Sequence, residues 1–184
     1  MQTSFIVTFI GDDRPGLVEQ LSSAIERCGG NWHESRLSQL GGKFAGLVLV
    51  SLPEDAAESL QQALKGLASS GISVRVTPAS AITDGGQGRR VTLAVLGPDR
   101  PGIVREISRA LAAEQVNVIE MESEVSSAPM SGELMFRADI LAEIPQAASM
   151  EALADALDVI AENMTLEIDL SGTPANPQAG SVAL

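Results

Sequence analysis

One eight-residue stretch occurs twice in this chain of 184 residues, and this repeat constrains the fold more than any other feature. The first copy, GDDRPGLV, runs from Gly11 to Val18, and the second, GPDRPGIV, runs from Gly97 to Val104, 86 positions later. Each copy follows a short apolar run and precedes apolar residues at helical spacing. This pattern indicates a strand, a tight turn and the start of a helix. A spacing of 86 residues is long enough for one small domain, so the repeat predicts two similar domains.

The segments around the first copy predict an ordered series of elements. Residues 4–10 alternate as a strand does, and residues 15–28 carry a helical stripe with Pro15 in the first helical position and Gly29-Gly30 after the end. Further strands are expected at 31–37, 44–52 and 71–77, with a hairpin turn at Gly41-Gly42 and a second helix at 54–67. The second repeat predicts strands at 91–95, 116–125, 133–141 and 165–170, with helices beginning near 103 and 153.

The resulting order, β-α-β-β-α-β, is the split βαβ or ferredoxin-like arrangement. The predicted fold class is therefore α+β, with two such domains, each an antiparallel four-stranded sheet with two helices on one face. The expected domains are residues 1–82 and 91–171. A flexible linker is expected at 83–90, and a tail rich in Gly, Pro and Ala at 172–184.

The charge of the chain argues against direct nucleic-acid binding. It has 12 basic and 24 acidic residues, a net charge of −12, and a phosphate backbone would be repelled by this field. Tyr is absent and aromatic residues make up 3%, so base-stacking platforms are not expected. Residues 89–184 carry 6 basic and 15 acidic residues, against 6 and 8 in residues 1–82. The acidic second half is either a solubilising surface or a docking face for a basic partner.

The chain offers few groups for catalysis or metal binding. Cys28 is the only cysteine and His33 the only histidine, so neither an intrachain disulfide nor a Cys/His metal site is expected. Cys28 falls on the helical stripe and is expected in the core. No G-x-S-x-G or phosphate-loop motif is present, which argues against an enzyme. We expect no cofactor, no membrane span, and a cytoplasmic location.

The repeated turn and an asparagine after each helix are the candidate functional features. As structure alone, Asp-Arg-Pro-Gly is a strand-to-helix turn, and Asn31 and Asn117 are left-handed caps at helix ends. As function, the free N–H groups of a helix start favour an anion. Both features recur together 86 positions apart, which favours the functional interpretation.

The motif and its surroundings resemble ACT domains, the small-molecule regulatory modules of amino-acid metabolism. The resemblance rests on Asp-Arg-Pro-Gly-[Leu/Ile]-Val after a strand and on the Asn-led strand after the helix, and it covers residues 4–80 and 90–170. Two ACT domains without a catalytic domain are similar to the glycine cleavage system transcriptional repressor family. The run from Ser127 to Gly132 before a strand also resembles that group.

The resemblance implies a small amino acid, glycine or serine, bound between the turn of one ACT copy and the Asn of another. A helix of 14 residues is about 21 Å long, so Arg14 and Asn31 are expected at opposite ends of one domain. Paired domains would place Asn117 near the first turn and Asn31 near the second. Arginine and helix N–H groups would hold the carboxylate, and an aspartate would accept from the ammonium. The expected ligand residues are Asp13, Arg14, Gly16, Asn31, Asp99, Arg100, Gly102 and Asn117.

Asp12 of the first turn is Pro98 in the second, so the two sites need not be equivalent. The expected function is a non-catalytic regulator that responds to an amino acid and acts on a protein partner. In the resembled family this partner is a DNA-binding activator of glycine cleavage genes. A homo-oligomer, formed through the sheets or helices, is also expected.

Two alternatives remain open at this stage. One is a ligand-free interaction module that controls an enzyme of amino-acid metabolism. The other is an acylphosphatase-like enzyme, which shares the topology and uses an Arg with an Asn. The separation of Arg14 from Asn31 argues against the enzyme.

Overall fold

The computed structural model describes residues 2–80 and 88–172. The chain divides into two compact units, Met1–Ile82 and Thr83–Leu184, and each is described by itself. The linker expected at 83–90 and the tail expected at 172–184 lie largely outside the described residues. The first strand of the second unit begins at Arg89, inside the range expected for the linker.

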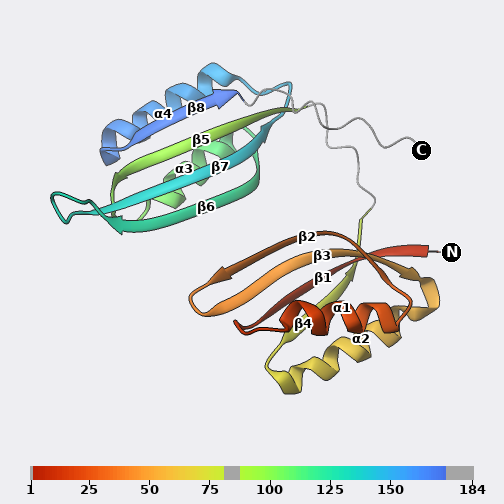
Figure 1. The fold of residues 1–184 in the computed structure, drawn as a ribbon. Coiled ribbons are helices and arrows are strands. Elements are labelled where there is room, and N and C mark those ends of the chain that lie inside the picture. The colour runs from red at the N-terminus through yellow and green to blue at the C-terminus, as the bar shows by residue number, and fades with distance from the viewer. Residues whose placement is uncertain (1, 81–87, 173–184) are drawn as a thin grey trace, which may run out of the picture. The chain divides into compact units, whose positions relative to one another are not determined.

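The first unit follows the order β-α-β-β-α-β, in which four strands form one antiparallel sheet (Figure 1). Its elements are β1 (Gln2–Asp12), α1 (Leu17–Arg27), β2 (Asn31–Leu40), β3 (Lys43–Pro53), η1 (Glu54–Ala56), α2 (Ala57–Gly66), η2 (Leu67–Ser70) and β4 (Ser73–Pro78). The strand order in the sheet is β2-β3-β1-β4. Both helices cover the same face of the sheet (Figure 1).

The second unit repeats this architecture, with strand order β6-β7-β5-β8. Its elements are β5 (Arg89–Pro98), α3 (Ile103–Ala113), β6 (Asn117–Ser127), β7 (Leu134–Ile144), α4 (Met150–Met164) and β8 (Glu167–Gly172). The predicted fold class, two ferredoxin-like α+β domains, is confirmed. None of the helices in the described part of the chain is long and apolar enough to cross a membrane.

Each unit has its own hydrophobic core between its helices and one face of its sheet. On β1, Phe5, Val7 and Phe9 are buried against α1 and α2, because alternate side chains of a strand point to the same face. On β5, Val91 and Leu93 play the same role. The opposite face of each sheet, which we call the outer face, is not covered by a helix of its own unit (Figure 1). Cys28 is half-buried and packs against the first core.

The predicted bounds of both helices of the first unit were wrong. The first helix begins at Leu17, two residues after Pro15, because Gly16 has φ +89° and cannot be part of a right-handed helix. The second predicted helix, 54–67, is an α-helix only from Ala57 to Gly66 and is flanked by η1 and η2. Short 3₁₀ turns are frequent at helix ends, and their boundaries are not visible in apolar spacing.

Candidate functional site

The two repeated turns have the same backbone conformation. Gly16 and Gly102 cap α1 and α3 with φ values of +89° and +103°. Only glycine adopts this left-handed region without strain, so the repeated glycine is required by the turn itself. Neither helix start has a side-chain cap. The N–H groups of the first helical turn are therefore available to a ligand or to water.

A main-chain hydrogen bond ties each turn to the neighbouring hairpin. The N–H of Asp13 donates to the carbonyl oxygen of Gly42 at 3.0 Å, and the N–H of Asp99 donates to that of Leu134 at 2.8 Å. Gly42 is the residue just before β3, and Leu134 is the first residue of β7. The two predicted aspartates are therefore fixed at equivalent places beside the helix starts.

The first turn lines a shallow, open depression of about 240 Å³. Its lining comes from the turn, α1 and β3: Asp13, Arg14, Gly16, Leu17, Val18, Glu19 and Phe44. Arg14 donates from Nη2 to the carbonyl oxygen of Ser70 at 2.8 Å, so its guanidinium is partly engaged by the protein itself. With Asp13 and Glu19 beside it, this depression is better suited to a cationic group than to an anion.

Asp12 precedes the first turn and forms an ion pair with Lys43, its cross-strand partner. The hydrogen bond from Lys43 and the positive charge of that residue lower the pKa of Asp12 below its ordinary value. Both side chains are exposed, so the pair holds the end of β1 against β3 only weakly. In the second unit the corresponding pair is Pro98 and Met135, which carry no charge.

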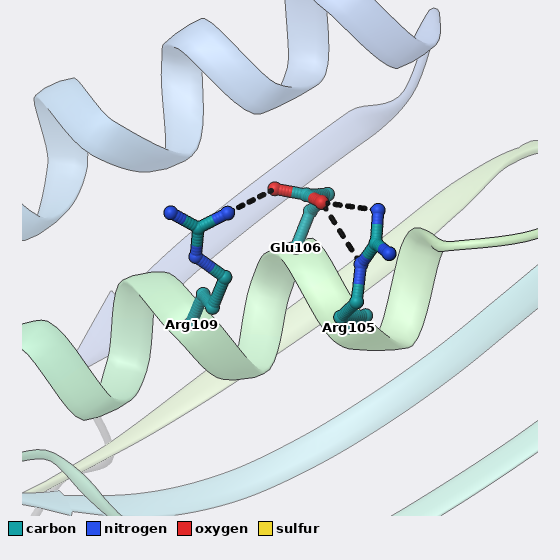
Figure 2. Close-up of polar contacts among 3 residues, drawn as sticks. All are labelled: Arg105, Glu106 and Arg109. Atoms are coloured by element: carbon teal, nitrogen blue, oxygen red, sulfur yellow. Dashed lines mark hydrogen bonds and ion pairs between the residues drawn. The ribbon is translucent and has the colours of Figure 1, made fainter.

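The second turn is richer in arginine. In the described residues, the Arg100 side chain forms no hydrogen bond or ion pair. Arg105 lies at the start of α3, and its Nη2 would come within 3.8 Å of a Cβ placed on Gly102. Figure 2 shows Glu106 between two arginines: Arg105 donates from Nη2 to its Oε1 at 2.9 Å, and Arg109 lies 3.9 Å from its Oε2. Three arginines against the two carboxylates of Asp99 and Glu106 leave a small excess of positive charge near Gly102, which favours an anion there.

Sequence reasoning missed Arg105. Its counterpart 86 positions earlier is Glu19, so the repeats carry opposite charges at the same place beside the turn. Aligning the two repeats beyond the eight-residue motif would have shown this difference in charge. In the first unit Glu19 instead accepts a hydrogen bond from the hydroxyl of Ser23 at 2.9 Å.

The two predicted asparagines are the first residues of β2 and β6, and neither is a left-handed cap. The left-handed position after the helix is taken by Gly29 in the first unit (φ +70°) and by Gln115 in the second (φ +56°). Within the first unit, α1 lies between the turn and Asn31. A helix of 11 residues is about 16 Å long, so Arg14 and Asn31 lie at its opposite ends.

The surroundings of the two asparagines differ. Asn31 pairs with Ser51 across the strands, and the ring of His33 lies 2.7 Å from the Ser51 hydroxyl, measured from Nε2 to Oγ. Asn117 instead pairs with Glu143. Each strand has a register shift two residues after its asparagine. In the described residues, no group of three or more His, Cys, Asp or Glu side chains converges as metal ligands.

Comparison with known proteins places both units in one family. Residues 3–77 and residues 91–158 each match a family model described as ACT domain. The glycine cleavage system transcriptional repressor of Escherichia coli (strain K12) is 23% identical over 168 residues, which cover 90% of this chain and 88% of that protein.

Two solved structures have the same fold over nearly the whole chain. An unknown protein from Galdieria sulphuraria is 33% identical, with a TM-score of 0.84, and the match covers 95% of this chain and all of that one. A protein provisionally assigned as a glycine cleavage system transcriptional repressor is 18% identical, with a TM-score of 0.67, and the match covers 93% of this chain and 97% of that one.

Proposed function

This chain belongs to the ACT domain family and contains two ACT domains in tandem, and from this premise we propose that it is a non-catalytic regulator that binds a small amino acid and acts on a protein partner. The observation that carries the proposal is the repeated turn, with its left-handed glycine and uncapped helix start. A turn that had only to connect a strand to a helix would not need arginine and aspartate twice at the same two positions.

The chemistry of the second turn suits the carboxylate of an amino acid. Arg100 supplies positive charge, Arg105 adds a charge that its ion pair with Glu106 partly neutralises, and the helix start supplies N–H donors. Asp99, beside the same helix start, would accept from the ammonium group. In the first turn, Asp13 and Glu19 favour the ammonium end, while Arg14 is already bonded to Ser70. The two turns are therefore proposed to bind the same zwitterion with different affinities.

An asparagine from another ACT domain would complete each site. Arg14 and Asn31 lie about 16 Å apart along α1, too far for a glycine-sized molecule to contact both. All eleven residues of β6 are exposed, and an exposed edge strand can pair with another strand. Such pairing would bring Asn117, at the start of β6, to the turn of a second ACT domain, and Asn31 would act in the same way from β2.

Glycine is the favoured ligand, because two of the relatives are named as glycine cleavage system transcriptional repressors. The net charge of −12 favours a protein partner over DNA, so the proposed action on transcription is indirect, through a DNA-binding activator. By linkage, the amino acid and the partner would change each other's affinity by the same factor.

The proposal is tested by a thermal-shift screen of the purified chain with the twenty amino acids, followed by titration calorimetry of those that raise the melting temperature. A ligand at 100 times its dissociation constant adds about 2.7 kcal/mol of stability. Asn117→Ala should reduce the shift, and the double variant Asn31→Ala with Asn117→Ala should abolish it. Ser108→Ala, on the exposed surface of α3, is the matched control. If no amino acid raises the melting temperature, the proposal is wrong.

A ligand-free interaction module is the second candidate, and the bond from Arg14 to Ser70 favours it for the first unit. In that case the turn has kept only a structural role. Arg14→Ala would then lower stability without any effect on amino-acid binding, whereas substitution of a residue that contacts the ligand would weaken binding.

A further inference from the structure

The outer faces of the two sheets differ strongly in charge although their backbones correspond. On the first unit, outward-facing apolar residues form a strip over the two central strands; they are Ile6, Ile10, Ala45, Leu47 and Leu49. Ile10 and Leu47 are 49% and 50% exposed. We call this the β1–β3 strip. It borders a shallow depression of about 250 Å³ on the outer face.

The corresponding face of the second unit is strongly acidic. The register of β5 to β8 places seven carboxylates and two arginines on it: Glu120, Glu122, Glu124, Asp139, Glu143, Glu167, Asp169, Arg90 and Arg137. Leu47 corresponds to Asp139 and Ala45 to Arg137. The second unit keeps apolar side chains at two of the corresponding positions, Leu96 and Leu141, but Asp139 and Arg137 lie between them on the central strands. The fold itself therefore does not require a continuous apolar strip on the outer face.

Charge around the β1–β3 strip is low and mixed. The outer face of the first unit carries two carboxylates and three basic side chains: Asp12, Glu34, Arg36, Lys43 and Arg75. Two of the basic groups are already paired, Lys43 with Asp12 and Arg36 with Glu34. Two copies of this face would therefore meet with little repulsion, whereas two copies of the acidic face would repel each other.

We propose that the β1–β3 strip is an interface between two copies of this chain, packed sheet against sheet about a two-fold axis. Aligned packing of two sheets buries their facing side chains in a layer about 10 Å thick. With the axis parallel to the strands, β2 of one copy lies over β4 of the other, because the two strands are at opposite edges of the sheet. Glu34 of one copy then lies one two-residue step from Arg75 of the other.

The size of the face meets the requirement for a stable dimer. Four strands spaced about 4.8 Å apart, paired over about nine residues at about 3.4 Å each, span about 600 Å² per copy. Two copies bury about 1,200 Å², the lower limit of specific stable interfaces. This surface is separate from the repeated turns, so the proposal does not depend on amino-acid binding.

The test is the solution mass of the full chain by light scattering after size exclusion, over a range of micromolar concentrations. The wild type should have twice the 19.1 kDa chain mass. Leu47→Asp, which installs the residue of the second unit, should raise the dimer dissociation constant at least about 100-fold, because two half-exposed leucines become buried carboxylates. Val159→Asp, at an exposed position of α4, is the control and should leave the dimer intact.

A second variant keeps the test decisive if Leu47→Asp does not fold. Arg75→Asp alters an exposed side chain at the rim of the strip, installs the residue found at Asp169, and should weaken the dimer more at low than at high salt. A monomeric wild type at every concentration would overturn the proposal. So would a dimer that survives both substitutions with the fold intact, because its interface would then lie elsewhere.

Discussion

The guanidinium of Arg14 donates from Nη2 to the main-chain carbonyl oxygen of Ser70 at 2.8 Å, across 56 positions of sequence. This bond joins the first turn to the end of η2, just before β4. Arg100, at the same position of the second turn, makes no such bond in the described residues. The two arginines of one repeated motif therefore have different roles.

The two arginines should contribute differently to stability. Arg14→Ala is expected to lower the free energy of unfolding of the first unit by about 1 kcal/mol, the net value of a typical hydrogen bond. Arg100→Ala should change stability by less than about 0.5 kcal/mol, as surface substitutions usually do. Urea denaturation followed by fluorescence of Trp32, the only tryptophan, reports on the first unit, and circular dichroism reports on both. Equal losses in the two variants would contradict the assignment.

The left-handed glycines should tolerate no side chain without strain. Gly16→Ala and Gly102→Ala are each expected to cost about 1–2 kcal/mol, because alanine is unfavourable at positive φ. Gly66→Ala is the matched control. Gly66 is the last residue of α2, has φ −58°, and has open space around its Cα. That substitution should stabilise the first unit by about 0.5–1 kcal/mol, and a similar loss in all three variants would count against the turn geometry.

The ion pair of Asp12 with Lys43 should make the first unit sensitive to acid. Lys43 lowers the pKa of Asp12, so the contribution of the pair is present above the ordinary aspartate pKa and is lost as the pH falls through the lowered value. A carboxyl titration by NMR should show the pKa of Asp12 below the ordinary aspartate value. In Lys43→Met, which installs the residue at position 135, the pKa of Asp12 should rise towards its ordinary value. High salt should weaken the effect, because both side chains are exposed.

Ser149 should be the residue that fixes the start of α4. Its Oγ accepts a hydrogen bond from the N–H of Ala152 at 3.1 Å, the geometry of an N-cap. Ser149→Ala is expected to cost about 1 kcal/mol. Ser108→Ala, in the middle of α3, removes a hydroxyl with no capping role and should be neutral or slightly stabilising. Thermal unfolding by circular dichroism distinguishes the two, and equal effects would exclude a capping role.

Much of the fold could be predicted from local pattern. The 86-residue repeat gave the two domains, and the alternation of Phe5, Val7 and Phe9 gave the buried face of β1. The start of α1 could not be predicted in the same way, because proline suits both a first helical position and the residue before a left-handed glycine. Only the backbone angles distinguish the two.

The candidate site was predicted only in part, because its differences depend on long-range contacts. The motif identified both turns and both asparagines. The motif could not indicate that Arg14 donates a hydrogen bond to the carbonyl oxygen of Ser70, since that contact depends on where η2 ends. The opposite charges of Glu19 and Arg105 lie outside the motif but were present in the sequence. The apolar outer face of the first unit required the register of β1 with β3.

The two hairpins close with different loops, and this has a consequence for how the chain folds. Gly41 and Gly42, both at positive φ, are the only residues between β2 and β3, whereas six residues separate β6 from β7. Closing a loop three times longer costs about 1 kcal/mol more in chain entropy. The β2–β3 hairpin should therefore form faster than the β6–β7 hairpin. The domain with the faster hairpin is the first to leave the ribosome, so it can fold before the second domain has been synthesised.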